Sequence, residues 1–176
     1  MTHYHLFETK LGFAGIAWGA DGITRFRLPD PDREAAARQF KGKVFSQSPP
    51  PHVAAVVEEA QRYFAGERID FKPIELDLSS TDPLRRSIYD ALRRVSFGET
   101  VTYGELAKRA GVNAPQAAQD VGVAMARNPV PLIIPCHRVL AAGGKLGGFS
   151  APGRTETKEK MLALEGVFIG NQPRLL

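Results

Sequence analysis

The sequence predicts an α+β fold in which a small amino-terminal domain of antiparallel sheet and helices is followed by a mostly helical domain with a helix-turn-helix. Three observations support this prediction: strand-like runs between glycine turns over residues 4–28, two helical stretches divided by prolines, and capped helices beyond residue 81. The chain has 176 residues, 43% of them hydrophobic, which is enough to bury one large core or two small ones.

The amino-terminal segment has the pattern of a small antiparallel sheet. Gly12 and the dipeptide Asp21-Gly22, which favours tight hairpins, separate short runs of strand-forming residues. We expect these three strands at residues 4–8, 13–18 and 23–28.

Two helices should follow, over residues 32–40 and 52–64. The proline run at 49–51 separates them, because proline lacks the amide donor that a helix interior needs. We expect one more strand at residues 71–78 and a polar linker after it. The domain boundary is therefore predicted between two parts, 1–80 and 81–176.

The second domain begins with a strong helix signal. Asp82 is a favoured N-cap before proline, and apolar residues then recur on one helical face to about Val95. Thr102 and Glu105 have capping-box spacing and begin a short helix that ends near Gly111. Asn113 is expected to begin another helix, running to about residue 127 after a tight turn. Such a pair is typical of a helix-turn-helix, although an ordinary helical hairpin has the same pattern.

Composition and charge exclude several classes of protein. No stretch approaches the roughly 20 apolar residues of a membrane-spanning helix, and the amino terminus lacks the features of a secretory signal, so we expect a cytoplasmic protein. A single cysteine excludes an intrachain disulfide and any zinc site with two thiolates, and we expect no metal. Residues 81–176 hold 13 Lys and Arg against 8 Asp and Glu, which favours an anionic partner for this half without requiring one.

The one cysteine lies in the most informative segment of the chain. Three prolines and an apolar run precede Cys136, and His137 and Arg138 follow it directly. Buried cysteines are commonly inert, but neighbouring basic residues favour the thiolate, which is the nucleophilic form. From these residues alone, a structural cysteine and a reactive one remain open.

The run Pro135-Cys136-His137-Arg138, preceded by an Asn-Pro segment, resembles the signature of the O6-alkylguanine-DNA alkyltransferases. The similarity extends through about half of the chain, from residue 81 to residue 166, with Tyr103 and Glu165 in matching order. It implies a methylated-DNA-[protein]-cysteine S-methyltransferase that moves an alkyl group from O6 of guanine, and also from O4 of thymine, irreversibly to Cys136. No cofactor is implied, and the expected partner is double-stranded DNA containing alkylated guanine, bound by a monomer.

By this resemblance each site residue has a role. Cys136 accepts the alkyl group, His137 is the base acting through a water, and Glu165 orients the imidazole. Tyr103 donates to the departing purine, and Asn128 braces the active-site turn. The pocket for the alkylated base would be lined by Pro131, Val139, Gly147, Phe149 and Ser150. Contacts with DNA would come from Ala117, Ala118, Gln119, Gly122, Met125, Arg127 and Arg138.

The chain departs from the family at the residues that hold a flipped base. Gln119-Asp120 stands where the family has an arginine followed by a small residue, Phe149 stands where relatives often carry tyrosine, and Ala151-Pro152 is a small insertion. Two other functions are considered. A non-catalytic lesion binder of the alkyltransferase-like type lacks the cysteine, and a helix-turn-helix regulator leaves Cys136 and Glu165 unexplained.

Overall fold

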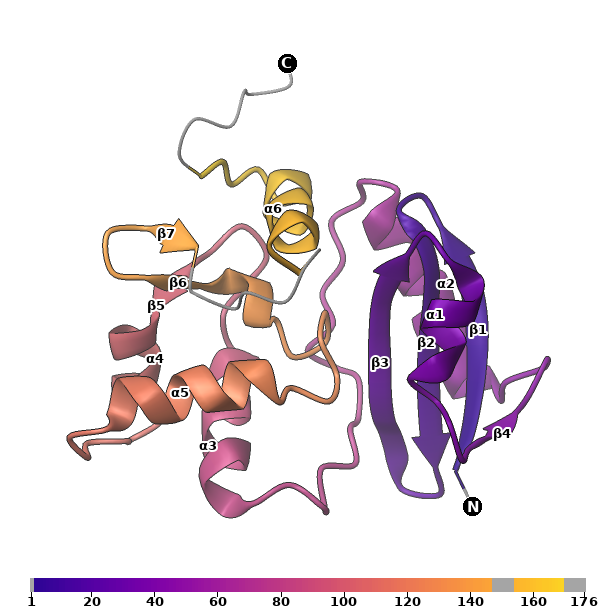
Figure 1. The fold of residues 1–176 in the computed structure, drawn as a ribbon, viewed down its shortest axis with the longest axis horizontal. Coiled ribbons are helices and arrows are strands. Elements are labelled where there is room, and N and C mark those ends of the chain that lie inside the picture. The colour runs from indigo at the N-terminus through magenta and orange to yellow at the C-terminus, as the bar shows by residue number, and fades with distance from the viewer. Residues whose placement is uncertain (1, 147–153, 170–176) are drawn as a thin grey trace. The chain divides into compact units, whose positions relative to one another are not determined.

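The computed structural model describes residues 2–146 and 154–169, and the chain forms two compact units (Figure 1). The first comprises the chain up to Ser80 together with Pro129–Leu132, and the second comprises the remainder. The return of Pro129–Leu132 to the first unit is not indicated by the sequence. Within that unit the Phe26 amide donates to the Pro129 carbonyl at 3.0 Å.

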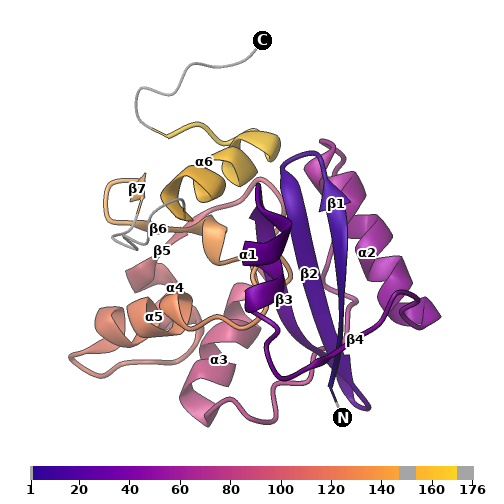
Figure 2. The ribbon, with the colours of Figure 1, turned by 45° about the vertical axis from the view of Figure 1, so that its right-hand side comes forward.

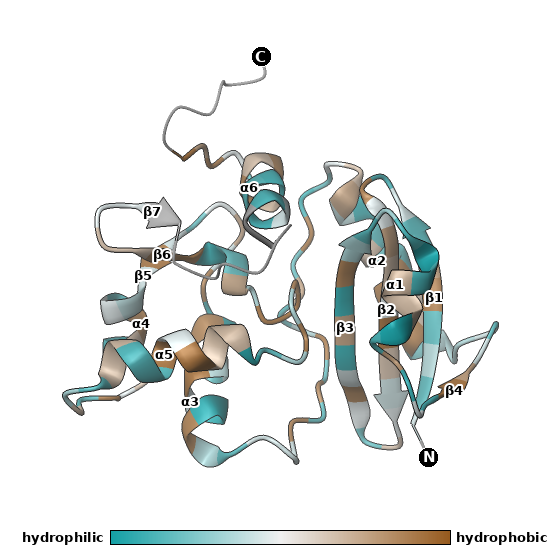
Figure 3. Cartoon of the chain, viewed as in Figure 1, coloured by the Kyte–Doolittle hydropathy of each residue, from teal (hydrophilic) through white to brown (hydrophobic). Residues whose placement is uncertain are grey.

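The first unit contains a four-stranded sheet in the order β3-β2-β1-β4. The three predicted strands are present and slightly longer than expected, and the short β4, parallel to β1, was not predicted; the bounds are β1 (His3–Thr9), β2 (Gly12–Gly19), β3 (Gly22–Asp30) and β4 (Val44–Phe45). Figure 3 shows hydrophobic and hydrophilic residues alternating along β3, as a strand with one buried face requires.

Two helices pack against this sheet, α1 (Arg33–Arg38) and α2 (Pro51–Phe64). Figure 2 shows them on opposite faces of the sheet. Asp32 caps α1 by accepting from the Glu34 amide, and proline occupies the first position of α2. The strand predicted at 71–78 is wrong: this segment makes only an isolated bridge between Leu76 and Ile23, because turns at residues 72–73 and 79–80 leave it too short for a ladder.

The second unit is mainly helical, as predicted, with a small three-stranded sheet in the order β5-β6-β7. Its helices are α3 (Pro83–Leu92), α4 (Tyr103–Arg109), α5 (Ala117–Ala126) and α6 (Arg154–Leu164), with the 3-10 turn η1 (Cys136–Arg138) and the strands β5 (Val101–Thr102), β6 (Val139–Ala141) and β7 (Lys145–Leu146). The expected caps form: Asp82 accepts from the Arg85 amide at 2.9 Å, and Thr102 accepts from the Glu105 amide at 3.1 Å.

The predicted start of α5 is wrong. The helix begins at Ala117 rather than near Asn113, and its N-cap Gln116 makes no side-chain cap hydrogen bond. The reason is Pro115, whose ring disfavours helical backbone at the preceding Ala114. The connection from α4 to α5 therefore runs over residues 110–116 and is longer than the tight turn we expected.

Gly12 provides a test of the sheet. Its φ is +127°, and an added Cβ would lie 2.5 Å from the Asp30 carbonyl oxygen, so Gly12→Ala should lower the free energy of unfolding by about 2–3 kcal/mol. The control is Gly19→Ala, because nothing lies within 4 Å of its Cβ position. Urea unfolding of both variants measures the difference, and equal stabilities would contradict the steric argument.

Candidate active site

A braced turn holds the cysteine. Asn128 Nδ2 donates to the Ile134 carbonyl at 2.8 Å, and the Cys136 amide donates to the same carbonyl at 2.8 Å. Leu132, buried in the approach to this turn, has a φ of +79°, a conformation that costs a leucine roughly 1–3 kcal/mol. Tertiary packing must fix such a residue, so the turn leading to Cys136 is held rather than relaxed.

His137 and Glu165 form a buried pair directly beside the cysteine. The His137 ring is 2% exposed, and its Nε2 lies 2.6 Å from Glu165 Oε2. Since a carboxylate can only accept, the proton of the neutral imidazole lies on Nε2. Nδ1 then carries the ring's lone pair, the group that a general base uses. Cys136, at the start of η1, is partly exposed.

Three donors besides His137 hold the Glu165 carboxylate. Arg138 binds both of its oxygens, with Nε 2.8 Å from Oε1 and Nη2 3.2 Å from Oε2. The Gly98 amide donates to Oε1 at 3.0 Å. Gly98 has a φ of +81°, and a Cβ there would lie 3.3 Å from the Glu165 carbonyl oxygen, so the close approach favours glycine.

The electrostatics of the pair favour a charged carboxylate and a neutral imidazole. Burial alone raises the pKa of Glu165, but the hydrogen bonds of His137 and Arg138 and the charge of Arg138 outweigh it and hold that pKa well below its ordinary value. Burial lowers the pKa of His137, and this outweighs the attraction of Glu165. At neutral pH His137 is therefore a base able to accept a proton.

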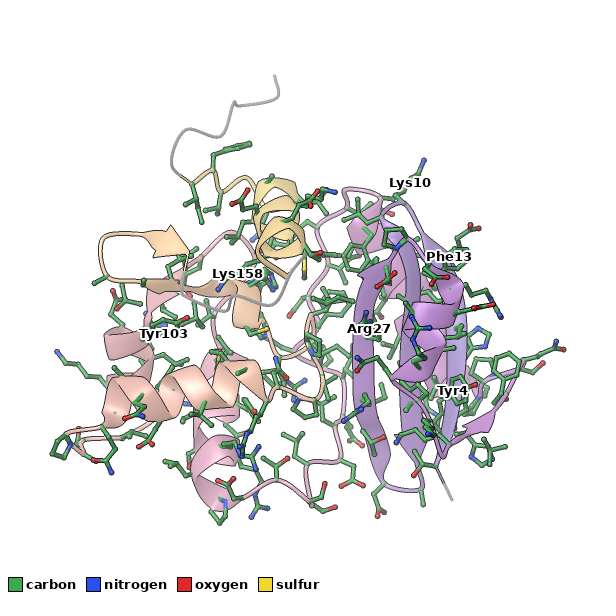
Figure 4. The ribbon with its side chains drawn as sticks, in the orientation of Figure 1. Tyr4, Lys10, Phe13, Arg27, Tyr103 and Lys158 are labelled. Atoms are coloured by element: carbon green, nitrogen blue, oxygen red, sulfur yellow. The ribbon has the colours of Figure 1, made fainter. Side chains whose placement is uncertain are left out.

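Three further side chains interact electrostatically with Cys136, namely Tyr89 on α3, Tyr103 and Lys158. Tyr103 begins α4, and burial, followed by the charge of Cys136, raises the pKa of its hydroxyl, so it stays protonated and able to donate. Lys158 lies on α6 and donates to the Val139 carbonyl at 2.7 Å, and burial lowers the pKa of its ammonium (Figure 4). The sequence analysis missed Lys158, although its position seven residues before Glu165 places the two on one helical face.

The structure places the predicted DNA-contacting residues in different environments. On α5 and just after it, Ala118, Gln119 and Arg127 are exposed, and Ala117 and Gly122 are partly exposed. Met125 instead is 5% exposed and packs in the core. Arg138 is also buried, and its three hydrogen bonds go to Glu165 and the Val95 carbonyl. The DNA contacts expected of Met125 and Arg138 therefore do not fit their placement.

The predicted pocket residues fall only partly within the described structure. Val139 is fully buried at the start of β6, and Pro131 is half-buried in the segment that groups with the first unit. Gly147, Phe149, Ser150 and the Ala151-Pro152 insertion lie outside the described residues.

The described parts of the chain, 2–146 and 154–169, contain no cluster of three His, Cys, Asp or Glu side chains able to hold a metal ion. None of their helices has the length and apolar content that crossing a membrane requires.

A thiol next to a buried histidine–carboxylate pair defines the class of a cysteine nucleophile with its general base. Residues 83–167 match the family model for the DNA-binding domain of 6-O-methylguanine DNA methyltransferase. The methylated-DNA–protein-cysteine methyltransferase of Mycolicibacterium paratuberculosis is 36% identical over 165 residues, covering 94% of this chain and 93% of that protein. The constitutive enzyme of Bacillus subtilis is 34% identical over 168 residues, covering 95% and 97%.

Solved structures agree with these relatives. The crystal structure of Mycobacterium tuberculosis O6-methylguanine methyltransferase has a TM-score of 0.75 and 31% identity, covering 98% of this chain and 97% of that one. A structure of the M. tuberculosis protein in complex with DNA has a TM-score of 0.74 and 32% identity, covering 93% of both chains. The chain belongs to the methylated-DNA–protein-cysteine methyltransferase family, which confirms the resemblance and the α+β fold class.

The buried carboxylate predicts a pH-dependent stability. Glu165→Gln should lower the free energy of unfolding by about 3 kcal/mol at pH 7, because Arg138 would keep its charge without a counter-charge. The folded-state pKa of Glu165 lies below the unfolded value of about 4.3, so its stabilisation is present above that value and lost as the pH falls below it. The difference in the free energy of unfolding between Glu165→Gln and wild type should therefore become smaller as the pH falls below about 5.

Urea unfolding between pH 3 and pH 8 measures this difference. The matched control is Glu156→Gln, which removes an exposed carboxylate paired with Lys160 and should change stability by less than about 1 kcal/mol. A pH-independent difference for the Glu165 variant would mean that the carboxylate is not ionised in the folded protein.

Proposed function

We propose that the protein repairs alkylated DNA by moving an alkyl group from O6 of guanine, and also from O4 of thymine, irreversibly to its own Cys136. The observation that carries the proposal is the buried His137–Glu165 pair beside the only cysteine of the chain. Membership of the methyltransferase family and the match of residues 83–167 to a DNA-binding domain support it.

The chemistry follows from the protonation states of the site. Neutral His137 accepts the thiol proton of Cys136 through a bridging water, and the imidazolium that forms is stabilised by Glu165. The thiolate attacks the alkyl carbon in line with the bond to O6. The sulfur–carbon bond forms, the carbon–O6 bond breaks, and its electron pair passes to the purine. Tyr103, whose raised pKa keeps its hydroxyl protonated, passes a proton to the departing guanine and regains one from the imidazolium of His137 through water, so that the thiol proton ends on the purine.

The product explains why each molecule should act once. A thioether on Cys136 is not hydrolysed under ordinary conditions, and the sequence offers no second cysteine to resolve it. One chain therefore repairs one base, and the reaction needs no cofactor. We assign the acting form to a cytoplasmic monomer.

Access to the lesion requires the base to leave the duplex, which costs a few kcal/mol. We assign α4 and α5 the role of a helix-turn-helix, with the exposed face of α5 against DNA. The small residues Ala118 and Gly122 allow this face a close approach, and Gln119 would fill the gap left by the flipped base.

The alternative is a non-catalytic lesion binder of the alkyltransferase-like type. That function needs neither a nucleophile nor a base beside it. Cys136 and the buried ion pair next to it therefore favour transfer over binding alone.

The direct test is the mass of the protein after reaction. Incubation with an oligonucleotide carrying O6-methylguanine should add a single methyl group, located on Cys136, with at most one equivalent transferred. Cys136→Ser should add none while binding the same DNA with nearly unchanged affinity, because the hydroxyl is a far weaker nucleophile of similar shape. Intact-protein and peptide mass spectrometry read out both results. Repeated turnover, or methyl on another residue, would falsify the single-use mechanism.

The departure at Gln119-Asp120 gives a second test. Gln119→Arg combined with Asp120→Ala should tighten binding to duplex DNA and speed duplex repair, because it adds a longer charged side chain and removes a charge that repels phosphates. The gain should shrink as salt rises. Single-stranded substrates should gain much less, since no stacked base must be extruded. The measurement is the single-turnover rate on both substrates at two salt concentrations, and equal duplex rates would mean that Gln119 already suffices.

A further inference from the structure

Arg138 points into the protein rather than toward a ligand. Its side chain is 8% exposed, and all three of its nitrogens donate within the second unit. Nε and Nη2 bind the two oxygens of Glu165, and Nη1 donates to the Val95 carbonyl at 2.7 Å. The same carboxylate that orients His137 is thus gripped from the other side by the residue that follows His137 in sequence.

We propose that Arg138 is a positioning residue of alkyl transfer: it fixes Glu165 as an oriented carboxylate and so keeps His137 neutral, with its proton on Nε2 and its lone pair on Nδ1. This inference rests on the proposed function, in which His137 is the base for Cys136.

The charges of the site explain why Arg138 matters for the protonation state of His137. Glu165 carries one negative charge, and Arg138 carries one positive charge. The buried pair is therefore balanced while His137 is neutral, and protonation of His137 would add an uncompensated charge. Without Arg138 less positive charge opposes a protonated His137, so the pKa of His137 should rise.

Lys158 acts on the pKa of His137 in the same direction as Arg138, and the charge of Cys136 changes during the reaction. Lys158 on α6 lowers the pKa of His137, as Arg138 does, while Glu165 raises it. Cys136, on η1, is neutral as the thiol and negative after its proton has left. Arg138 contacts the carboxylate that holds the imidazole through two hydrogen bonds.

The geometry requires the planar fork of arginine. Two parallel N–H groups meet the two oxygens of Glu165, and a third meets the Val95 carbonyl. Both Val95 and Gly98, which donates to Glu165, lie in the connection after α3. Arginine and carboxylate are thereby anchored to one loop. A lysine at position 138 would keep the charge but could not make all three contacts.

The experiment measures single-turnover transfer from single-stranded oligonucleotide carrying O6-methylguanine, between pH 5 and pH 9, with wild type, Arg138→Met, Arg138→Lys and Glu165→Gln. In Arg138→Met the rate should begin to fall at a pH about one unit higher than in wild type. Between pH 8.5 and pH 5.5 this variant should therefore lose about tenfold more of its rate than wild type does. Arg138→Lys should react several-fold more slowly with the wild-type profile. Arg62→Met, an exposed arginine of α2 in the first unit, is the control and should match wild type.

The double variant Arg138→Met, Glu165→Gln tests whether Arg138 acts through the carboxylate. Loss of Arg138 should shift the acid side of the pH profile upward less in the Glu165→Gln background than in the wild-type background, because only the direct repulsion between Arg138 and a charged imidazole is then lost. A shift as large in the Glu165→Gln background as in the wild-type background would overturn the proposal. So would an equal loss of rate at every pH in Arg138→Met, which is the result of a merely structural role.

A second measurement keeps the inference testable if Arg138→Met does not fold. The imidazole of His137 can be titrated by NMR in wild type and in Arg138→Lys, and it should stay neutral to well below pH 6.5 in both. Titration of the wild-type ring at or above pH 6.5 would overturn the proposal. If wild type transfers no methyl group at any pH, the proposed function fails, whereas a wild-type ring that is protonated at pH 6.5 contradicts the role of Arg138 alone.

Discussion

The carboxylate of Glu165 is the constraint on which the second unit depends. It has no exposed surface, and it accepts hydrogen bonds from His137, Arg138 and Gly98, which lie 27 to 67 residues away in sequence. A buried charge is tolerated only when its partners are in place, and losing one partner costs more than the pair contributes. The end of α6, the turn η1 and the loop after α3 must therefore come together as one arrangement.

The same constraint prepares the chemistry. A base must be uncharged before it can take a proton, and burial favours the uncharged form of His137. The hydrogen bond to Glu165 places the hydrogen of the imidazole on Nε2. Asn128 fixes the turn that delivers Cys136. Orientation of this kind is established during folding, so little rearrangement is left for the reaction itself.

A structural feature could be predicted from the sequence where it depends on residues that are close together in the chain. The hairpins around Gly12 and Gly22 and the caps Asp82 and Thr102 depend on residues within four positions, and they formed as expected. The start of α5 differs from the prediction because Pro115 disfavours helical backbone at the residue before it. Cys136 and its basic neighbours stood out in the sequence itself, whereas the roles of His137 and Glu165 came from the family resemblance, since no spacing rule joins residues 28 positions apart.

The residues that sequence reasoning misjudged are those whose partners are remote. Arg138 was assigned to DNA by the family resemblance, but its partners are Glu165 and the Val95 carbonyl. Lys158 was overlooked because nothing nearby marks a lysine as buried. The grouping of Pro129–Leu132 with the first unit likewise depends on a contact with Phe26, about a hundred positions earlier.

Asp120 shows how folding and the proposed binding make opposite demands on one residue. The N-terminus of α5 has no side-chain cap, and Asp120 is the acidic residue of its first turn. A carboxylate there interacts favourably with the helix dipole, a contribution of about 0.3–1 kcal/mol. On a face turned toward phosphates the same charge opposes binding. Because the exposed face of α5 otherwise offers Gln119, Val123 and small residues, its contribution to DNA binding would be close fit, and attraction to the phosphates must come from arginines and lysines elsewhere on the unit.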